Sequence, residues 1–254
     1  PGGSRAVSPR STAAGSAGQG QGRRSTDARS TSSSGLRFPA DAVIEELDRA
    51  TQNELRALDE FQRPFVAGHL VMATRLLEAD PEQALAHARV AASRAPRLAV
   101  VREAAGLAAY AAGDWAAAIK DLKASMRISG SYEFWPIVAD CERGLGKPEK
   151  AIAMAGEEHV RGLSVEGRVE MRIVAAGARA DMGQLDAALL TLKCPELTQR
   201  SDSDWAVRLR YAYADLCEQS GLLQEAVDWF AKAADIDEDD LTDAAERLQA
   251  LLQS

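Results

Sequence analysis

Apolar residues recur along most of the chain at the spacing of one face of an α-helix. Two clear faces are Ala84, Ala88 and Ala91, and Ala226, Phe230 and Ala233. Both follow the i, i+4, i+7 order of side chains that line up on one side of a helix. The pattern predicts an all-α protein built from amphipathic helices. Aromatic residues make up only 5% of the chain, so small alanine side chains should fill much of its core.

A short motif repeats within this pattern, in which a Gly is followed five residues later by an Ala. The copies are Gly113/Ala118, Gly146/Ala151, Gly183/Ala188 and Gly221/Ala226, and in Ala79/Ala84 an Ala replaces the Gly. The five closing alanines are 34, 33, 37 and 38 residues apart, and a period of about 34 residues is typical of helix–turn–helix arrays. We expect each Gly to end a first helix in the left-handed conformation, and each Ala to lie where two helix backbones approach closely.

The motif divides the chain into an N-terminal tail at 1–37 and a repeat domain at 38–254. Five helix pairs are expected near 65–98, 99–131, 132–166, 167–202 and 203–240. A helix or two at 40–60 and one helix at 241–252 should cap the ends, because the ends of an array need a polar outer face. The last helix is expected to bury a face made of Leu241, Ala245, Leu248 and Leu252.

The repeat resembles the tetratricopeptide repeat (TPR) family, whose pattern has Gly and Tyr in the first helix, Ala and Phe in the second, and a closing Pro. Gly106, Phe230 and Pro96 occupy such positions. Residues 38–254 are also similar to uncharacterised cytoplasmic TPR proteins of high-GC Gram-positive bacteria, through the segments at 100–107, 139–143 and 209–215. The resemblance implies a right-handed α-solenoid whose first helices line a concave groove, a cytoplasmic location and no enzyme activity.

Alignment with the TPR pattern places twelve candidate side chains at exposed positions of this groove, together with Ala73 and Leu107. They are His69, Glu103, Tyr110, Glu133, Asp140, Arg143, Glu170, Asp181, Arg208, Tyr211, Asp215 and Glu218. Acids outnumber bases there by seven to two, so the groove should attract a basic peptide or protein surface and repel nucleic acid. The simpler alternative is that these residues only solvate the helix faces.

The tail carries the opposite charge. Residues 1–37 contain six Arg and one Asp, so the tail carries a net charge of +5. The whole chain carries −8, so residues 38–254 carry −13. The Ser-, Gly- and Ala-rich composition of the tail is typical of a disordered segment. The tail is either a solubilising leader, or part of an RNA- or ribosome-associated accessory factor that also uses basic patches on the outer surface. Those patches contain Arg89, Arg94, Arg97 and Arg102. The opposite charges also suggest that the tail occupies the groove until a partner displaces it.

The chain shows no motif for catalysis or for a cofactor. Its three histidines, His69, His87 and His159, are far apart, and neither His-Glu-x-x-His, Cys-x-x-Cys nor Gly-x-Ser-x-Gly occurs. The cysteines are Cys141, Cys194 and Cys217, whose irregular spacing favours reduced core thiols. No apolar run approaches the ~18 residues of a membrane span. These features favour a non-enzymatic protein that does not cross a membrane.

One acidic segment matches part of a calcium-binding pattern. Asp235, Asp237, Asp239, Asp243 and Glu246 fall at positions 1, 3, 5, 9 and 12 of such a loop. Position 6 should be Gly, but it is Asp240, which we expect to prevent the sharp turn. The alternative is an acidic linker that caps the final helix, where negative charge is favourable.

Overall fold

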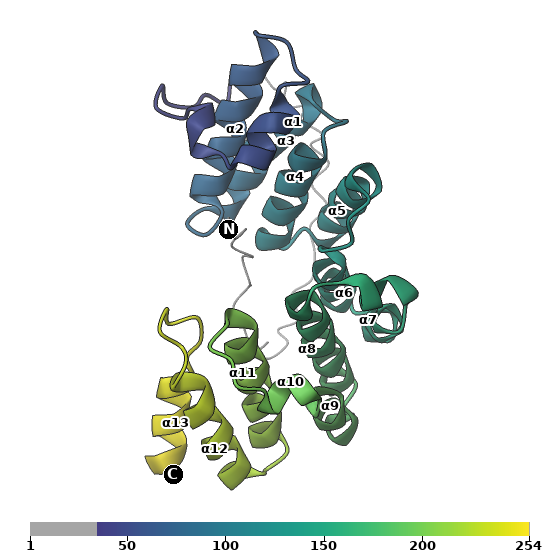
Figure 1. The fold of residues 1–254 in the computed structure, drawn as a ribbon, viewed down its shortest axis with the longest axis vertical. Coiled ribbons are helices and arrows are strands. Elements are labelled where there is room, and N and C mark those ends of the chain that lie inside the picture. Colours follow the sequence, from purple (N-terminus) through teal and green to yellow (C-terminus); the bar gives the residue numbers. More distant parts are fainter. Residues whose placement is uncertain (1–34, 254) are drawn as a thin grey trace, which may run out of the picture.

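The computed structural model describes residues 35–253, and every regular element in that range is a helix (Figure 1). The elements are η1 (Ile44–Glu46), α1 (Arg49–Leu55), α2 (Gln62–Leu76), α3 (Pro81–Arg94), α4 (Ala99–Ala111), α5 (Trp115–Ser129), α6 (Trp135–Gly144), α7 (Pro148–Ala155), η2 (Glu158–Gly162), α8 (Val165–Asp181), α9 (Leu185–Leu192), α10 (Pro195–Thr198), α11 (Asp204–Gln219), α12 (Leu223–Ala234) and α13 (Ala244–Gln253). The prediction of an all-α fold is confirmed for this range. Most of the predicted tail, residues 1–34, lies outside it.

Helices that follow one another along the chain pack as pairs, namely α2 with α3, α4 with α5, α6 with α7, α8 with α9, and α11 with α12. The pairs succeed one another in an arc, with α4, α6, α8 and α11 on its inner side and α5, α7 and α9 on its outer side (Figure 1). The sequence sets several of the helix starts. Pro81 and Pro148 are the first residues of α3 and α7, where a missing N–H leaves no hydrogen bond unmade.

The repeated Gly and Ala occupy the positions expected of them. The four glycines have φ between 71° and 75°, and each follows the end of a first helix; they are Gly113, Gly146, Gly183 and Gly221. The five alanines are fully buried in the second helices; they are Ala84, Ala118, Ala151, Ala188 and Ala226. The left-handed conformation of the glycines is therefore confirmed, and the alanines are buried as expected of a packed position. A close approach occurs at Gly106, where an added Cβ would lie 2.6 Å from Leu122 Cγ.

The longer spacing of the last two copies has a structural cause. Two short helices are inserted after the second helices of the third and fourth pairs, η2 after α7 and α10 after α9. Leu163 follows η2 and Leu197 lies in α10, and both side chains are buried. The insertions therefore add apolar packing, which keeps the helix pairs in contact although the sequence period is stretched.

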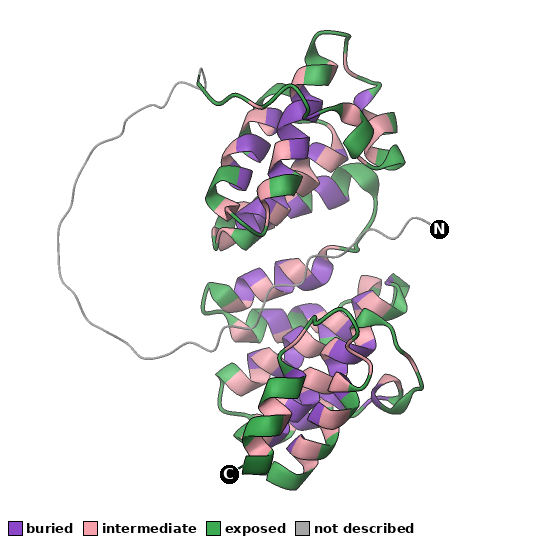
Figure 2. Ribbon diagram, turned by 90° about the vertical axis from the view of Figure 1, so that its left-hand side faces the viewer, coloured by how far each residue is buried: buried purple, intermediate pink, exposed green. Residues whose placement is uncertain are grey.

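Buried residues lie between the helices, while the outward surfaces are exposed (Figure 2). The core consists of clusters that each span neighbouring helix pairs. Alanine dominates the cluster between α2 and α5, as the low aromatic content predicts. Larger side chains fill the C-terminal cluster, in which Tyr213 and Phe230 are almost completely buried. None of the described helices is both long enough and apolar enough to cross a lipid bilayer.

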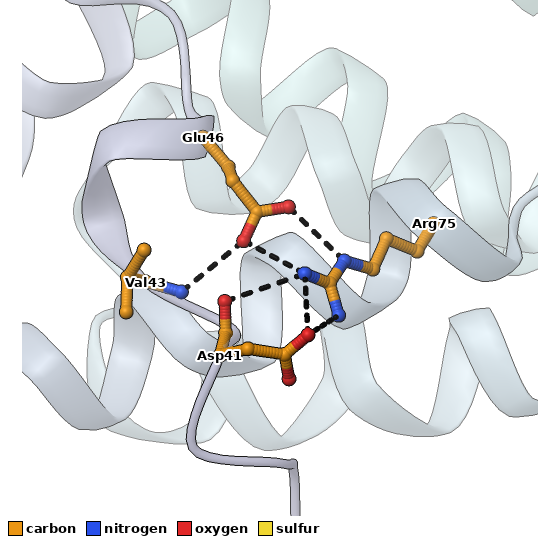
Figure 3. A network of polar contacts seen from close by, with 4 residues as sticks. All are labelled: Asp41, Val43, Glu46 and Arg75. Carbon is orange, nitrogen blue, oxygen red and sulfur yellow. Dashed lines mark hydrogen bonds and ion pairs between the residues drawn. The ribbon is translucent and has the colours of Figure 1, made fainter.

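The N-terminal cap holds α2 and α4 through polar contacts. The Arg75 guanidinium on α2 binds the carboxylates of Asp41 and Glu46, at 3.3 and 2.9 Å (Figure 3). The Glu54 carboxylate of α1 accepts hydrogen bonds from the first backbone N–H groups of α4. Negative charge is favourable at that end of a helix, so α1 fixes the start of α4.

The predicted buried face of the C-terminal helix is confirmed at Leu248 and wrong at its other three positions. Ala244, Leu248 and Leu251 pack on the core, whereas Leu241 and Leu252 are 41% and 67% exposed. Because α13 begins only at Ala244, Leu241 precedes the helix and cannot set the phase of its buried face.

Candidate functional site

The inner side of the arc carries three arginines, each of which binds two carboxylates. The first is Arg143 of α6, whose guanidinium lies 2.9 Å from Asp140 on the same helix and 2.7 Å from Asp181 on α8. Gly177 of α8 leaves room for it, because an added Cβ would lie 2.8 Å from Arg143 Nη1. The contact therefore ties two neighbouring first helices together.

The second arginine joins α11 to α8. Arg208 is 13% exposed, and it binds Glu166 at 2.9 Å and Glu170 at 2.5 Å. Burial raises the pKa of Glu170 above its usual value, and the positive charge of Arg208 opposes this rise. Glu166 was not among the predicted groove residues, because it lies in the first turn of α8.

The third arginine joins α13 to α11. Arg247 binds Asp215 at 3.0 Å and Glu218 at 2.6 Å, and it lies 3.4 Å from the Tyr211 hydroxyl. Sequence reasoning missed Arg247 because the cap helix was expected to contribute only packing. We call the three groups, Asp140–Arg143–Asp181, Glu166–Arg208–Glu170 and Asp215–Arg247–Glu218, the inner bridges.

Tyr110 extends this series to α4 but is not exposed as predicted. Tyr110 is only 7% exposed, its ring packs against Trp115, and its hydroxyl donates a hydrogen bond of 2.5 Å to Asp140. Burial and the Asp140 charge raise the pKa of Tyr110 above its usual range. Tyr110 therefore positions Asp140 and offers little surface to a partner.

Two predicted acids have no cationic partner in the described part of the chain. Glu133 is exposed and lies 3.4 Å from the Ser164 hydroxyl. Glu103 on α4 is partly buried and makes no hydrogen bond or ion pair there. Burial, together with the charges of Asp48 and Glu54, raises the pKa of Glu103 from 4.5 to about 7. The surroundings of Glu103 therefore disfavour the ionised form of its side chain.

The prediction that His69 and Ala73 are exposed is wrong. Both are buried, and His69 lies against Phe38, with ring centroids 5.0 Å apart. The sequence predicted a helix or two at 40–60 but did not indicate that the segment at 36–47 packs along α2, where it covers that surface. The inner face that remains open begins at α4.

The other candidate groups are engaged inside the protein. Burial raises the pKa of Cys141 to about 12 and that of Cys217 to about 11, so both thiols stay protonated at neutral pH. Two of the outer arginines form ion pairs, Arg89 with Asp114 and Arg102 with Asp121. These pairs reduce the positive charge that the RNA-binding alternative needs.

The acidic loop after α12 is ordered by its own side chains. The Asp237 carboxylate accepts hydrogen bonds from the Leu241 and Thr242 N–H groups. Asp240 has a φ of 51°, so it adopts a left-handed conformation although it is not Gly. Aspartate tolerates this conformation better than most residues. Within residues 35–253, no three potential metal-ligating side chains converge at this loop or elsewhere.

The predicted groove residues from α6 to α11 thus lie together on one inner surface, where most are already paired. Glu166 and Arg247, added to the full set of predicted groove residues, bring the acids to eight and the arginines to three. No protein-family model matches this chain, and no curated protein matches it in sequence.

Proposed function

We propose that residues 38–254 form a right-handed, TPR-like α-solenoid of about five helix pairs that acts as a non-enzymatic interaction scaffold. The inner face binds a basic peptide or protein surface. The consecutive helix pairs and the Gly/Ala period of about 34 residues support the architecture. The TPR architecture that the sequence resembles is thereby proposed for residues 38–254.

The charge of the inner face is the observation that carries this proposal. Each inner bridge combines one arginine with two carboxylates and so keeps a net charge of −1. Glu103 and Glu133 add two further carboxylates with no cationic partner in the described residues. Negative charge is therefore distributed along the arc from α4 to α13. Such a surface favours an extended partner with several cationic side chains.

Glu103 gives the strongest local support. A carboxyl group whose pKa rises from 4.5 to about 7 destabilises the folded state by about 3 kcal/mol when ionised, at 1.36 kcal/mol per pKa unit. A cation from a partner would lower that pKa again and recover part of this free energy. Strongly perturbed groups concentrate at functional sites, and none of the backbone caps described above uses Glu103.

Binding of a fluorescein-labelled peptide of alternating Arg and Ser, followed by fluorescence anisotropy, tests the proposal. We expect binding that weakens steeply with salt, and that falls about tenfold in the variant Glu103→Gln/Glu133→Gln, because two contacts of about 0.7 kcal/mol each are lost. The matched control is Glu149→Gln/Asp186→Gln, which removes two exposed carboxylates from outer helices.

A peptide that does not bind at low salt, or equal losses in both variants, would refute the inner face as the site. A parallel filter-binding measurement with single-stranded RNA separates the two functions, because an RNA-binding protein should retain RNA at low salt. We expect no retention, since the inner face repels phosphates.

A further inference from the structure

Two histidines that are 18 residues apart in sequence meet between α2 and α3. His69 is 0% exposed and His87 is 2% exposed, and their Nδ1 atoms lie 2.9 Å apart. One ring must therefore donate an N–H to the bare nitrogen of the other. His69 Nε2 is also buried and has no hydrogen-bond partner in the described structure. The accepting ring must be neutral, and burial disfavours a charge on the donating ring.

Protonation of this pair is unfavourable at both steps. A first added proton puts a positive charge among apolar rings, and a second puts N–H groups face to face across 2.9 Å. Burial and the neighbouring His87 lower the pKa of His69 from 6.5 to about 4, and burial also lowers the pKa of His87. The folded pair therefore resists protonation that the same side chains accept readily when exposed.

The charged groups on the surrounding elements do not offset this cost. In the described residues, no carboxylate makes a hydrogen bond or ion pair with either imidazole. The N-terminal segment and α2 use their charges on each other, through Asp41, Glu46 and Arg75. On α3, the Arg94 guanidinium lies over the Phe65 ring, 5.4 Å from its centroid. On α4, Arg102 binds Asp121 of α5.

The pair also holds the N-terminal segment in place. The Phe38 ring rests on the edge of His69 and directly over Gly68, where an added Cβ would lie 2.3 Å from the ring. The Arg75 contact of Figure 3 also holds this segment, and Ile44 and Leu47 pack on the N-terminal core cluster. An open cavity of about 560 Å³, lined by Phe38, Val43 and Phe65 among others, lies between part of the segment and the start of α2. The packing of the segment on α2 is therefore incomplete at this cavity.

The geometry points to an acid-sensitive latch: protonation of the His69–His87 pair opens the contact between α2 and α3 and releases the segment at 36–47 from α2. Release would uncover the apolar surface around Phe65 and Gly68 at the N-terminal end of the arc. The latch does not depend on the inner face from α4 to α13. An experiment can therefore refute the latch or the proposed binding function without refuting the other.

Hydrogen exchange followed by mass spectrometry tests the latch at pH 7.5 and 5.5, above the range in which most carboxylates titrate. After correction for the intrinsic pH dependence of exchange, the protection of 36–47 and 62–94 should fall about tenfold at pH 5.5. This factor follows from a His69 pKa of 6.5 in the open state and about 4 in the closed state. Peptides from 204–234 serve as the internal reference and should change much less. An equal change in all three regions, or none, would overturn the latch.

The variant His69→Leu/His87→Leu replaces both imidazoles with side chains that cannot take up a proton, and should lose the acid response of the N-terminal region. His159→Gln is the control and should keep it. A double variant that responds to acid as the wild type does contradicts the latch. If that variant does not fold, long-range ¹⁵N–¹H NMR of the wild-type histidines decides instead: both rings should stay neutral at pH 6, and a charged His69 there would overturn the proposal.

Discussion

Removing Arg208 should destabilise the protein far more than the loss of an exposed ion pair. The substitution Arg208→Met keeps much of the side-chain volume but leaves Glu166 and Glu170 facing each other without a cation. Loss of one partner of a fully buried pair costs about 3–5 kcal/mol. Because the Glu166 side chain is 44% exposed and that of Glu170 24%, we expect a smaller loss of about 2–3 kcal/mol.

The matched control is Arg75→Met at the N-terminal cap. Arg75 also binds two carboxylates, Asp41 and Glu46, but these three side chains are 35%, 71% and 37% exposed. Exposed pairs contribute little to stability, because water and salt screen their charges. Thermal unfolding followed by circular dichroism should therefore show a decrease in Tm of roughly 5–10 °C for Arg208→Met and at most about 3 °C for Arg75→Met.

The pH dependence of this loss identifies its cause. Burial already raises the pKa of Glu170, and removal of Arg208 should raise it further. A carboxyl group whose folded pKa is raised stabilises the protein below its unfolded pKa and loses this effect as pH rises through the folded value. The penalty of Arg208→Met should thus shrink from pH 7.5 to pH 5, and adding Glu166→Gln/Glu170→Gln should recover most of it. A penalty equal to that of Arg75→Met, or one independent of pH, would refute this account of the inner bridges.

Four further outcomes are expected. Glu103→Gln should stabilise the protein by about 2–3 kcal/mol at pH 7.5 and give no gain below pH 4.5, since the raised pKa of about 7 makes ionised Glu103 unfavourable; urea unfolding at both pH values checks this. Gly146 has a φ of 71°, and no atom lies within 4 Å of an added Cβ, so Gly146→Ala should lower the unfolding free energy by about 1–2 kcal/mol through backbone strain alone. Gly156 has a φ of −87°, so Gly156→Ala should change the unfolding free energy by less than about 0.5 kcal/mol. Phe230→Ala should cost about 3–5 kcal/mol, because it leaves a cavity in the C-terminal cluster, and hydrogen exchange should locate the loss in the last helix pairs. Deletion of 1–34 should raise the affinity for the basic peptide or change its salt dependence, and identical binding curves would remove the idea that the tail competes for the inner face.

The helix pairs were predictable because their determinants are local. The left-handed turn at Gly146 and the helix start at Pro148 depend on residues adjacent in sequence. The buried Ala151 follows from the same motif, since its spacing from Gly146 places it on the packed face of the second helix. The array could therefore be outlined without coordinates.

The candidate site was only partly predictable because its charges are balanced between helices. The pairing of Arg208 with Glu166 spans 42 residues, and that of Arg247 with Asp215 spans 32. No local pattern encodes such contacts, which depend on how neighbouring helices are rotated. His69 was misplaced for a similar reason, since its contact with Phe38 joins residues far apart in sequence and no local pattern indicates it. Its partner could have been anticipated only by placing α2 and α3 side by side.

The inner bridges also bear on how the arc can bend. Along its concave side, each first helix from α6 to α13 is fastened to the next by the long, flexible side chain of one arginine. At about 1 M salt the range of electrostatic attraction shrinks to roughly 3 Å, and these fastenings weaken while the apolar packing within each pair persists. The arc should then become more flexible, so that its curvature changes without unfolding and its width adjusts to the bound partner.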